Sequence, residues 1–336
     1  LSRNTVSKAL KNSSEVSENT RNLVIKTASK LGYKNATFAT PVIPASETGS
    51  NGTILFLTRT YASDSEFWTT VLRGIESILS NANYHLAISI MSDSDLKQLN
   101  FPQTISDSSI KGIILVEICD KVVCDALSQF NLPIVSVDMP NVPFEELNGI
   151  DVVTMESKKN LKKIINQLIE KGAESFGFVG DLYSPNVSRG FQERYNALSE
   201  CLAEHQLPLN QKNCLLHQTP EDFRNFQTTV NNLQAMISLP DVFICGNDWT
   251  AIQLIYALQF LGFQIPKDIC VVGFDNIPAA SRISPSLTTI STPQKYLGIA
   301  AARQILERIQ HPNCPHVFCQ YETELIIRNS TNITSF

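Results

Sequence analysis

The chain has 336 residues, of which 43% are apolar and 18% are charged, and its net charge is −5. A chain of this length is too long for one ordinary domain and suggests two or three, with enough apolar residues to bury substantial cores. It contains no apolar run of about 18 residues, which excludes a membrane-spanning helix, and it opens without a signal-peptide pattern.

Residues 1–33 predict two short helices joined by a turn. Ser2 and Ser17 are placed to cap the two helices, and apolar side chains recur at three- and four-residue spacing on one face of each. The inner positions are Thr5, Val6, Ala9 and Leu10 in the first helix and Thr20, Val24, Ala28 and Leu31 in the second. The opposite, polar face of the first helix is therefore free to contact a partner.

The same stretch is basic, whereas the rest of the chain is acidic. Up to Lys34 there are seven basic and two acidic residues, a net charge of +5, so the remainder carries −10. A small basic segment on an acidic body indicates a polyanionic partner for that segment alone. An ordinary solvated helix pair with surface lysines is the alternative interpretation of these charges.

Three motifs occur in this stretch. They are LSRNTVSKALK at 1–11, VSENTR at 16–21 and LGY at 31–33. The series resembles the headpiece of the LacI/GalR family of bacterial transcription regulators, with its patterns V-S-x-x-T-V-S-R-x-L-N, V-S-x-x-T-R and L-G-Y. The resemblance implies a recognition helix that reads base edges in the major groove through Arg3, Asn4 and Lys8. The residues that it implies as phosphate contacts are Ser2, Thr5, Ser7 and Arg21.

In that family another helix, with the pattern I-x-D-V-A-x-x-A-G, comes before this segment. The sequence begins at Leu1 without that helix, so we expect an incomplete helix-turn-helix headpiece over residues 1–35. We interpret the missing helix as a truncated chain or an incomplete reading frame.

A linker is predicted over residues 36–51, where Pro41, Pro44 and Gly49 lie among hydroxyl residues and charged residues are almost absent. The resemblance implies a short hinge helix here, which orders on operator DNA and inserts an apolar side chain into the minor groove. Pro44 would cost a helix interior about 3 kcal/mol, so the formation of this hinge helix is left open.

From residue 52 onward short apolar strands alternate with amphipathic helices, the pattern of parallel sheets covered by helices on both faces. A first round of strands is predicted near 53–57, 86–91, 112–117 and 133–137. A second round is predicted near 151–155, 176–179, 214–218, 242–245 and 269–273, and one last strand near 318–327. Buried helix stripes are predicted at Phe67, Val71, Ile75, Ile78 and Leu79 and at Leu161, Ile165, Leu168 and Ile169. The predicted fold class is α/β, with two doubly wound parallel sheets.

The resemblance extends over this region and implies the two-lobed core of periplasmic binding proteins, as an effector-binding domain over 52–336. It also implies that the chain crosses between the lobes near Glu156, Ser291 and Cys319. The implied lobes are 52–155 with 292–318, and 156–291 with 319–330. Because open parallel sheets bind ligands beyond the carboxyl ends of their strands, the effector site is expected at those ends.

Two candidate effector residues follow the first strand, in the run DSEFW at 64–68. The family has N-P-F-F at this point, and its second aromatic residue stacks on the effector ring. The resemblance therefore implies that Trp68 is the stacking residue, with Asp64 beside it in the site. Ordinary packing of Trp68 is the alternative.

An arginine candidate lies after the strand predicted at 176–179. The family pattern R-x-x-G-F-x-x-A-L is matched best from Arg194 onward, although Ala197 replaces its glycine. The resemblance implies that the planar Arg194 guanidinium binds two effector hydroxyls. Arg189 is the alternative register, and a surface arginine is the alternative role.

Two more candidates lie at later strand ends. The run CGND at 245–248 resembles the family's A-x-N-D, which implies that Asn247 binds an effector hydroxyl and that Asp248 caps the next helix. The run IPKDICVVGFDNIP at 265–278 resembles I-P-x-D-V-x-V-x-G-F-D-D-I-P and implies that Asp275 accepts from effector hydroxyls. Simple turn formation is the alternative for Asp275.

Eight cysteines occur without a C-x-x-C pair, and several lie inside apolar runs. Reduced, buried thiols are the favoured interpretation, which indicates a reducing, cytoplasmic compartment. Four possible zinc ligands fall within one short stretch, namely His311, Cys314, His316 and Cys319. Two prolines stiffen that stretch and a strand is predicted to begin in it, so neither a metal nor a cofactor is predicted.

These features predict a transcriptional repressor that binds operator DNA as a homodimer and responds to a small effector, a sugar, bound between two lobes. A purine or a sugar phosphate is the alternative effector, and induction and corepression both stay open. A sugar-binding transport protein would explain the body but not the headpiece. An enzyme is not predicted, because no G-x-G-x-x-G, G-x-x-x-x-G-K, G-x-S-x-G or H-E-x-x-H motif occurs.

Overall fold

The computed structural model describes residues 2–10, 16–17, 20, 23–24, 27, 50–59, 65–182, 188–217 and 225–333. The chain divides into two compact units, Leu1–Gly49 and Ser50–Phe336. Most of the predicted linker, and with it the question of the hinge helix, lies outside the described residues.

The first unit contains helix α1 (Arg3–Leu10), as predicted. Ser2 caps this helix, because the Thr5 N–H donates to the Ser2 hydroxyl at 3.1 Å. Three side chains are buried together with a fourth packed against them, namely Ala9, Val16 and Val24 with Val6. The predicted inner face of α1 therefore packs on Val24, which lies in a described, helical part of the second predicted helix.

The second unit alternates strands and helices. Its strands are β1 (Thr53–Arg59), β2 (His85–Met91), β3 (Ile110–Val116), β4 (Ile134–Val137), β5 (Ile150–Met155), β6 (Phe176–Asp181), β7 (Leu215–His217), β8 (Val242–Cys245), β9 (Cys270–Asp275), β10 (Thr288–Ser291), β11 (Phe318–Tyr321) and β12 (Glu324–Ile326). Its α-helices are α3 (Glu66–Asn81), α4 (Asp93–Gln98), α5 (Lys121–Ser128), α6 (Lys159–Glu170), α7 (Arg189–Glu204), α8 (Phe226–Ala235), α9 (Asp248–Phe260) and α10 (Gln294–Gln310). Short 3-10 helices are η2 (Gln103–Ser106), η3 (Phe144–Glu146), η4 (Gln211–Asn213) and η5 (Pro278–Ser281).

The described strands form two six-stranded sheets, in the orders β11-β5-β4-β3-β1-β2 and β12-β10-β9-β8-β6-β7. The described pairings between these strands are parallel, except that β10 and β12 run antiparallel. The predicted α/β fold with two doubly wound sheets is therefore confirmed. We call each sheet with its helices a lobe, the first containing β1 and the second containing β6.

The pairing corrects two strand predictions and adds one strand that was not predicted. The strand predicted at 151–155 belongs to the first round, because β5 pairs with β4 and β11. The single strand predicted over 318–327 is two strands, β11 in the first sheet and β12 in the second. Strand β10 was not predicted, since its four residues are mostly hydroxyl residues without a clear apolar pattern. Sheet membership depends on pairing between distant segments, which a local pattern does not encode.

The chain passes between the two sheets three times, from β5 to α6, from β10 to α10 and from β11 to β12. The third passage lies between Tyr321 and Glu324, slightly later than the boundary expected near Cys319. Cys319 itself stays in the first lobe, because it pairs with Val153 of β5.

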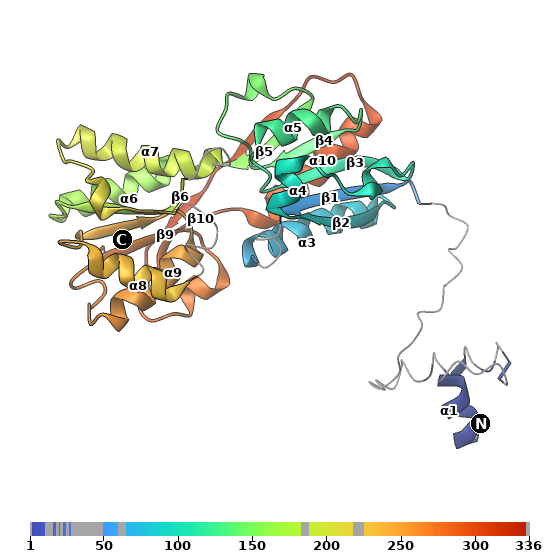
Figure 1. Ribbon diagram of the computed structural model, residues 1–336, viewed down its shortest axis with the longest axis horizontal. Coiled ribbons are helices and arrows are strands. Elements are labelled where there is room, and N and C mark those ends of the chain that lie inside the picture. Colours follow the sequence, from blue (N-terminus) through green and yellow to red (C-terminus); the bar gives the residue numbers. More distant parts are fainter. Residues whose placement is uncertain are drawn as a thin grey trace. The chain divides into compact units, whose positions relative to one another are not determined.

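Helices cover both faces of each sheet (Figure 1). In the first lobe α3 and α10 pack together on one face, and α4 and α5 cover the other. In the second lobe α6 and α7 lie on one face, and α8 and α9 on the other. The predicted stripes of α3 and α6 are largely the buried ones, with Phe67, Val71, Ile75 and Leu79 in α3 and Leu161, Ile165 and Leu168 in α6.

Helices α3 and α10 come together where glycine is required. A Cβ atom on Gly74 would lie 2.3 Å from the Lys295 carbonyl oxygen, and a Cβ atom on Gly298 would lie 2.0 Å from that of Val71. Because the obstructing atoms belong to the backbone, they cannot move aside as a flexible side chain could. The two glycines thus set the close packing of these helices.

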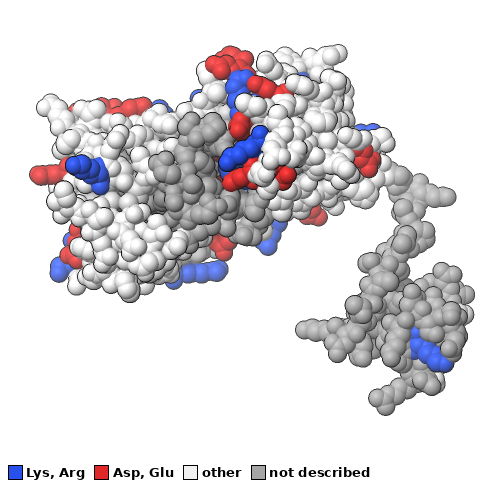
Figure 2. All heavy atoms as spheres, in the orientation of Figure 1, with Lys and Arg blue, Asp and Glu red and all other residues white. Residues whose placement is uncertain are grey.

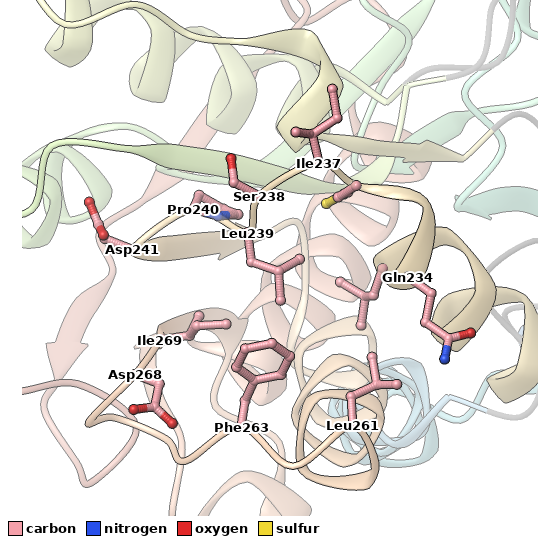
Figure 3. Close-up of a pocket in the computed structure, with 12 residues that line it drawn as sticks. Gln234, Ile237, Ser238, Leu239, Pro240, Asp241, Leu261, Phe263, Asp268 and Ile269 are labelled. Carbon is pink, nitrogen blue, oxygen red and sulfur yellow. The ribbon is translucent and has the colours of Figure 1, made fainter.

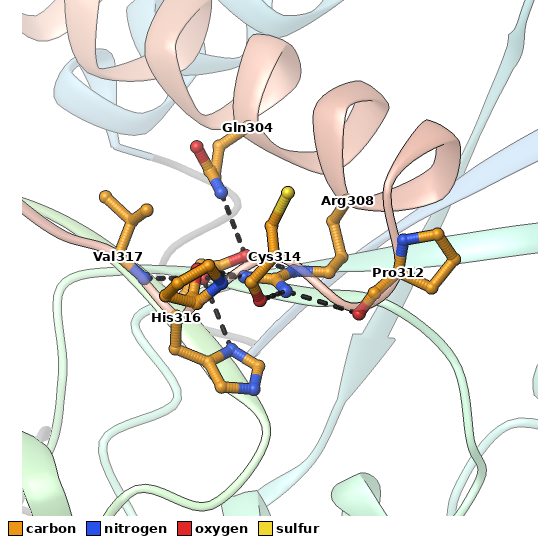
Figure 4. Close-up of polar contacts among 8 residues, drawn as sticks. Gln304, Arg308, Pro312, Cys314, His316 and Val317 are labelled. Carbon is orange, nitrogen blue, oxygen red and sulfur yellow. Dashed lines mark hydrogen bonds and ion pairs between the residues drawn. The ribbon is translucent and has the colours of Figure 1, made fainter.

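A buried ion pair joins the last turn of α10 to the start of β5 (Figure 4). The Arg308 guanidinium contacts both oxygens of the fully buried Asp151 carboxylate, at 2.8 and 3.0 Å. The Val317 N–H also donates to Asp151, at 2.8 Å. Two of the possible zinc ligands take part in this network, since His316 Nδ1 lies 3.3 Å from Asp151 and the Cys314 carbonyl accepts from Arg308. Across the described ranges, no three potential ligands are grouped for a metal.

Candidate functional site

Three acidic residues at the carboxyl ends of strands have an unusual backbone conformation. Glu117 follows β3, Asp138 follows β4 and Asp275 ends β9, with φ angles of 56°, 76° and 116°. Such conformations cost non-glycine residues about 1–3 kcal/mol each and tend to occur where a binding site requires them. The strain therefore marks the carboxyl ends of both sheets as the candidate site.

Hydrogen bonds from Thr292 and from Gln294, the first residue of α10, hold Asp275 in its strained conformation. The Asp275 carbonyl oxygen accepts from Gln294 Nε2 at 2.8 Å and from Thr292 Oγ1 at 3.2 Å. Burial raises the pKa of the Asp275 carboxyl group well above its ordinary value, although the charge of Arg194 favours the ionised form. The segment that returns to the first lobe thus positions this acidic group.

Arg194 is the cation that faces this carboxyl group. It lies on α7 and is only 4% exposed. Its Nη1 atom donates to the Gly246 carbonyl oxygen at 2.7 Å, and its Cζ atom lies 3.6 Å from the centre of the Phe274 ring. Burial lowers the pKa of Arg194, and the carboxylates of Asp275 and Asp138 oppose that effect. Its buried Nε atom has no hydrogen-bond partner, so it can donate to a ligand.

Asn247, and not Asp248, has the capping role at the start of α9. Asn247 is the residue that caps α9, because its Oδ1 atom accepts from the Thr250 N–H at 2.9 Å. Asp248 is fully buried and accepts instead from the Ile277 N–H at 2.9 Å and from the Thr289 hydroxyl. The prediction that Asp248 caps α9 is therefore wrong, because the turn aims its carboxyl group into the sheet.

The two lobes touch beside these groups. Pro140 of the first lobe and Ser188 of the second form an isolated antiparallel bridge, and the Arg189 N–H donates to the Met139 carbonyl at 2.9 Å. Burial raises the pKa of the Asp138 carboxyl group, while a hydrogen bond from Met139, the charge of Arg194 and the Ser188 hydroxyl act in the opposite direction. Asp138 of the first lobe thus interacts with two residues of the second.

The structure brings three predicted effector residues, Arg194, Asn247 and Asp275, together at the carboxyl ends of β8 and β9 in the second sheet. Arg194 binds the carbonyl next to Asn247 and stacks on the ring next to Asp275. Its alternative, Arg189, instead pairs with Glu193 at 2.8 Å. The remaining two predicted residues belong to the start of the first lobe, where Trp68 is partly exposed on α3 and Asp64 lies outside the described residues.

Sequence reasoning missed Glu117 and Asp138 as candidates. Each directly follows a strand that is almost entirely buried, so an acidic residue at the end of an apolar run was the available signal. That signal is weak by itself, because acidic residues are common in turns. The positive φ angles and the electrostatic contact with the second lobe distinguish these two residues from ordinary turn formers.

The predicted DNA-binding residues are only partly described. Ser2 and Lys8 are exposed, and the Ser2 and Thr5 hydroxyls are hydrogen-bonded to each other at 2.8 Å. The side chains of four others lie outside the described residues, namely Arg3, Asn4, Ser7 and Arg21.

A pocket of about 450 Å³ opens in the second lobe, at the amino ends of β8 and β9 (Figure 3). The loops that precede β8 and β9 line it, with Leu239 and Phe263 among its apolar side chains. It therefore lies at the amino ends of these strands, whereas Asn247 and Asp275 lie at the carboxyl ends. The pocket contains none of the predicted effector residues.

The charged side chains, the thiols and the helix lengths of the described residues bear on three of the predictions. On the face drawn in Figure 2, basic and acidic side chains of the second unit are scattered, and much of the surface is uncharged. The cysteines have free thiols, and five of them are buried, namely Cys119, Cys124, Cys201, Cys245 and Cys270. Within the described ranges, no helix is long and apolar enough to cross a membrane.

Comparison with known proteins matches two families to this chain. Residues 1–35 match the family described as bacterial regulatory proteins, lacI family. Residues 165–331 match the periplasmic binding protein-like domain. The ribose operon repressor of Haemophilus influenzae is 27% identical over 334 residues, which cover 98% of this chain and 95% of that protein.

Solved structures show the same fold. A LacI family transcriptional regulator from Enterococcus faecium with bound ribose has a TM-score of 0.67 and 24% identity, covering 83% of this chain and 98% of its own. The lac repressor dimer bound to operator and an anti-inducer has a TM-score of 0.69 and 20% identity, covering 98% of this chain and 96% of its own.

Proposed function

Because this chain belongs to the lacI family of bacterial regulatory proteins, we propose that it is a cytoplasmic repressor that binds operator DNA and a sugar effector. The first unit would bind DNA, and the lobes of the second would bind the effector between them. The relatives are named as transcription regulators rather than enzymes, which supports a binding function.

The arrangement of Arg194, Asp138 and Asp275 where the lobes touch is the observation that carries the effector proposal. A guanidinium with an unpartnered Nε atom and carboxyl groups from both lobes match the alternating donors and acceptors of a polyol. A ligand that contacts both lobes would favour one lobe arrangement and so couple to DNA binding, typically by about 1–3 kcal/mol.

A homodimer is part of the proposal, because one half-site of a near-palindromic operator would bind each copy. The lac repressor, which shares the fold, is named as a dimer bound to its operator. A purine or a sugar phosphate is the second candidate effector. A transport role is disfavoured, because the lacI family match at residues 1–35 would then have no purpose.

Selection from a random pool of duplex DNA tests the DNA-binding half of the proposal. We expect the protein to retain a near-palindromic sequence and its affinity to fall steeply with added salt, as phosphate contacts require. Lys8→Ala should weaken binding, and Lys171→Ala, a matched change on the second unit, should not. Failure to retain any sequence at low salt would contradict the proposal.

Asp275→Asn tests the effector half with the same operator. Asparagine tolerates positive φ angles, so the variant should fold and bind DNA while losing the response to whichever sugar alters wild-type binding. Operator binding by fluorescence anisotropy, with and without sugars, measures both properties. A variant that responds like the wild type would remove Asp275 from the effector site.

A further inference from the structure

Two consecutive residues after β9 have positive φ angles. Asp275 ends the strand with a φ of 116°, and Asn276 follows with a φ of 56°. Because neither residue is glycine, both positions are strained, and surrounding groups must hold the backbone in this shape. We call residues 275–277 the strained turn. Asp275 and Asn276 share a peptide unit, so a group that holds Asn276 also restricts the backbone from which the Asp275 carboxyl group projects.

The Asn276 side chain is held at both ends of its amide group. Its Oδ1 atom accepts from Arg328 Nη2 at 2.6 Å, and its Nδ2 atom donates to the Ser291 hydroxyl at 3.1 Å. The last residue of the strained turn, Ile277, donates its N–H to the Asp248 carboxyl group at 2.9 Å. Side chains from three other segments of the chain therefore fix this turn, and one of them comes from the segment after β12.

Arg328 also contacts the far end of the connection that begins at Asn276. Its Nη1 atom donates to the Leu287 carbonyl oxygen at 2.8 Å, and Leu287 directly precedes β10. The connection between β9 and β10, residues 276–287, thus begins and ends at one guanidinium. Because the donors of a guanidinium have fixed directions in one plane, the group sets the separation of its two acceptors.

Buried hydrogen bonds fix the backbone that carries Arg328. Its N–H donates to the Thr288 hydroxyl at 2.9 Å, and that hydroxyl lies 3.1 Å from the Arg328 carbonyl oxygen, to which it can donate. The Ser330 hydroxyl donates to the Val271 carbonyl oxygen at 2.6 Å and accepts from the Thr288 N–H at 2.8 Å. Thr288 and Ser330 are completely buried. The segment after β12 is therefore attached to β9 and β10, which positions the guanidinium against the strained turn.

We propose that Arg328 is a positioning residue for effector binding, which holds the strained turn through Asn276 and thereby orients the Asp275 carboxyl group. The inference rests on the proposed role of Asp275 in binding an effector. Arg328 acts without contacting the effector, because its Nη1 and Nη2 atoms donate to protein acceptors. An effector that meets a preformed carboxyl group loses less free energy in ordering it, so the contact raises the affinity.

Calorimetric titration of the whole protein with ribose, xylose, glucose, galactose and cellobiose tests the effect on affinity. For each sugar that binds the wild type, Arg328→Met should weaken binding at least about tenfold, because the turn loses a charge-assisted hydrogen bond. Arg328→Lys keeps the positive charge but lacks the planar group, so it should recover only part of this loss. Full recovery by lysine would assign the effect to charge and overturn positioning by the guanidinium.

Ser330→Ala is the matched control for lost stability. It removes two hydrogen bonds of the same segment and leaves the contacts of the strained turn in place. Arg328→Met and Ser330→Ala should both lower the melting temperature, but Ser330→Ala should change the sugar affinity by less than about twofold. Equal losses of affinity in the two variants would show a purely structural effect and overturn the inference.

Hydrogen exchange measures the strained turn without any sugar. By mass spectrometry, a peptide that covers residues 275–281 should exchange at least about tenfold faster in Arg328→Met than in the wild type, and Ser330→Ala should resemble the wild type. Unchanged exchange in Arg328→Met, or a sugar that binds this variant with wild-type affinity, would overturn the inference alone. If no sugar binds the wild type, the proposed sugar effector is refuted and the inference falls with it.

Discussion

Asp248 illustrates at the scale of one residue how burial determines the state of a charge. Its carboxyl group is fully buried at the ends of β8, β9 and β10, where Ile277 and Thr289 hydrogen-bond to it. Burial raises its pKa to about 7, because a carboxylate loses its hydration there. Near neutral pH the group is therefore divided between its protonated and ionised forms.

The raised pKa predicts a pH-dependent stability. Between the ordinary pKa of 3.8 and the folded-state pKa of about 7, the folded protein binds this proton more tightly than the unfolded chain does. The free energy of unfolding should therefore fall as pH rises through this window, by on the order of 4 kcal/mol in total, and then level off. Asp248→Asn, which reproduces the protonated acid, should lack this component.

Denaturant unfolding of both proteins between about pH 5 and about pH 7 measures the difference. The wild type should lose roughly 2 kcal/mol relative to Asp248→Asn over that interval. Glu145→Gln, an exposed change in the first lobe, should follow the wild type. Parallel pH profiles for wild type and Asp248→Asn would show that the group is ionised throughout.

At the scale of elements, the contact between Asp151 of β5 and Arg308 of α10 secures the last segment of the first lobe. Both side chains are almost inaccessible, at 0% and 6% exposure. Arg308 also donates to the carbonyls of Cys314 and Pro315, so that one guanidinium holds the turn that leads into β11. The pair thereby aligns β11 with β5.

Asp151→Asn should destabilise the protein by about 3–5 kcal/mol, because it leaves a buried guanidinium without its counter-charge. The exposed pair of Lys121 and Asp125, with N and O 2.6 Å apart, is the matched control. Asp125→Asn should cost at most about 1 kcal/mol, since water solvates both partners. Denaturant titration measures both values, and equal losses would contradict the assigned role of the buried pair.

At the scale of the whole molecule, α8 and α9 leave aromatic side chains uncovered. The exposed fractions are 37% for Phe226, 39% for Trp249, 44% for Tyr256 and 69% for Phe260. The rings of Phe226 and Phe260 meet edge to face at 5.8 Å. Exposed aromatic side chains are typical of a protein interface, and we expect the proposed homodimer to bury the contacting rings of Phe226 and Phe260.

Phe260→Glu should therefore weaken dimerisation, because a buried glutamate would face the aromatic surface of the second copy. Sedimentation velocity over a range of concentrations measures the change, which we expect to exceed tenfold in the dissociation constant. Val122→Glu is the control, since Val122 is 62% exposed on α5 of the first lobe. A dimer of unchanged affinity in Phe260→Glu would place the interface elsewhere.

The sequence by itself determined the class of fold and the order of most elements. Apolar runs such as VFIC in β8 and the stripe of α3 follow the periods of a strand and a helix, so local chemistry was sufficient to predict them. The family resemblance of the runs at the strand ends also implied Arg194, Asn247 and Asp275 as candidates. Their roles as effector contacts stay predictions that the proposed experiments test.

The tertiary structure alone decided which strands share a sheet and which charges share a site. The assignment of β5 and β11 to the first sheet depends on pairing between segments far apart in the chain. Glu117 and Asp138 become part of the candidate site only because two lobes place their strand ends together. Local patterns carry neither kind of information, since both depend on distances between residues that are remote in sequence.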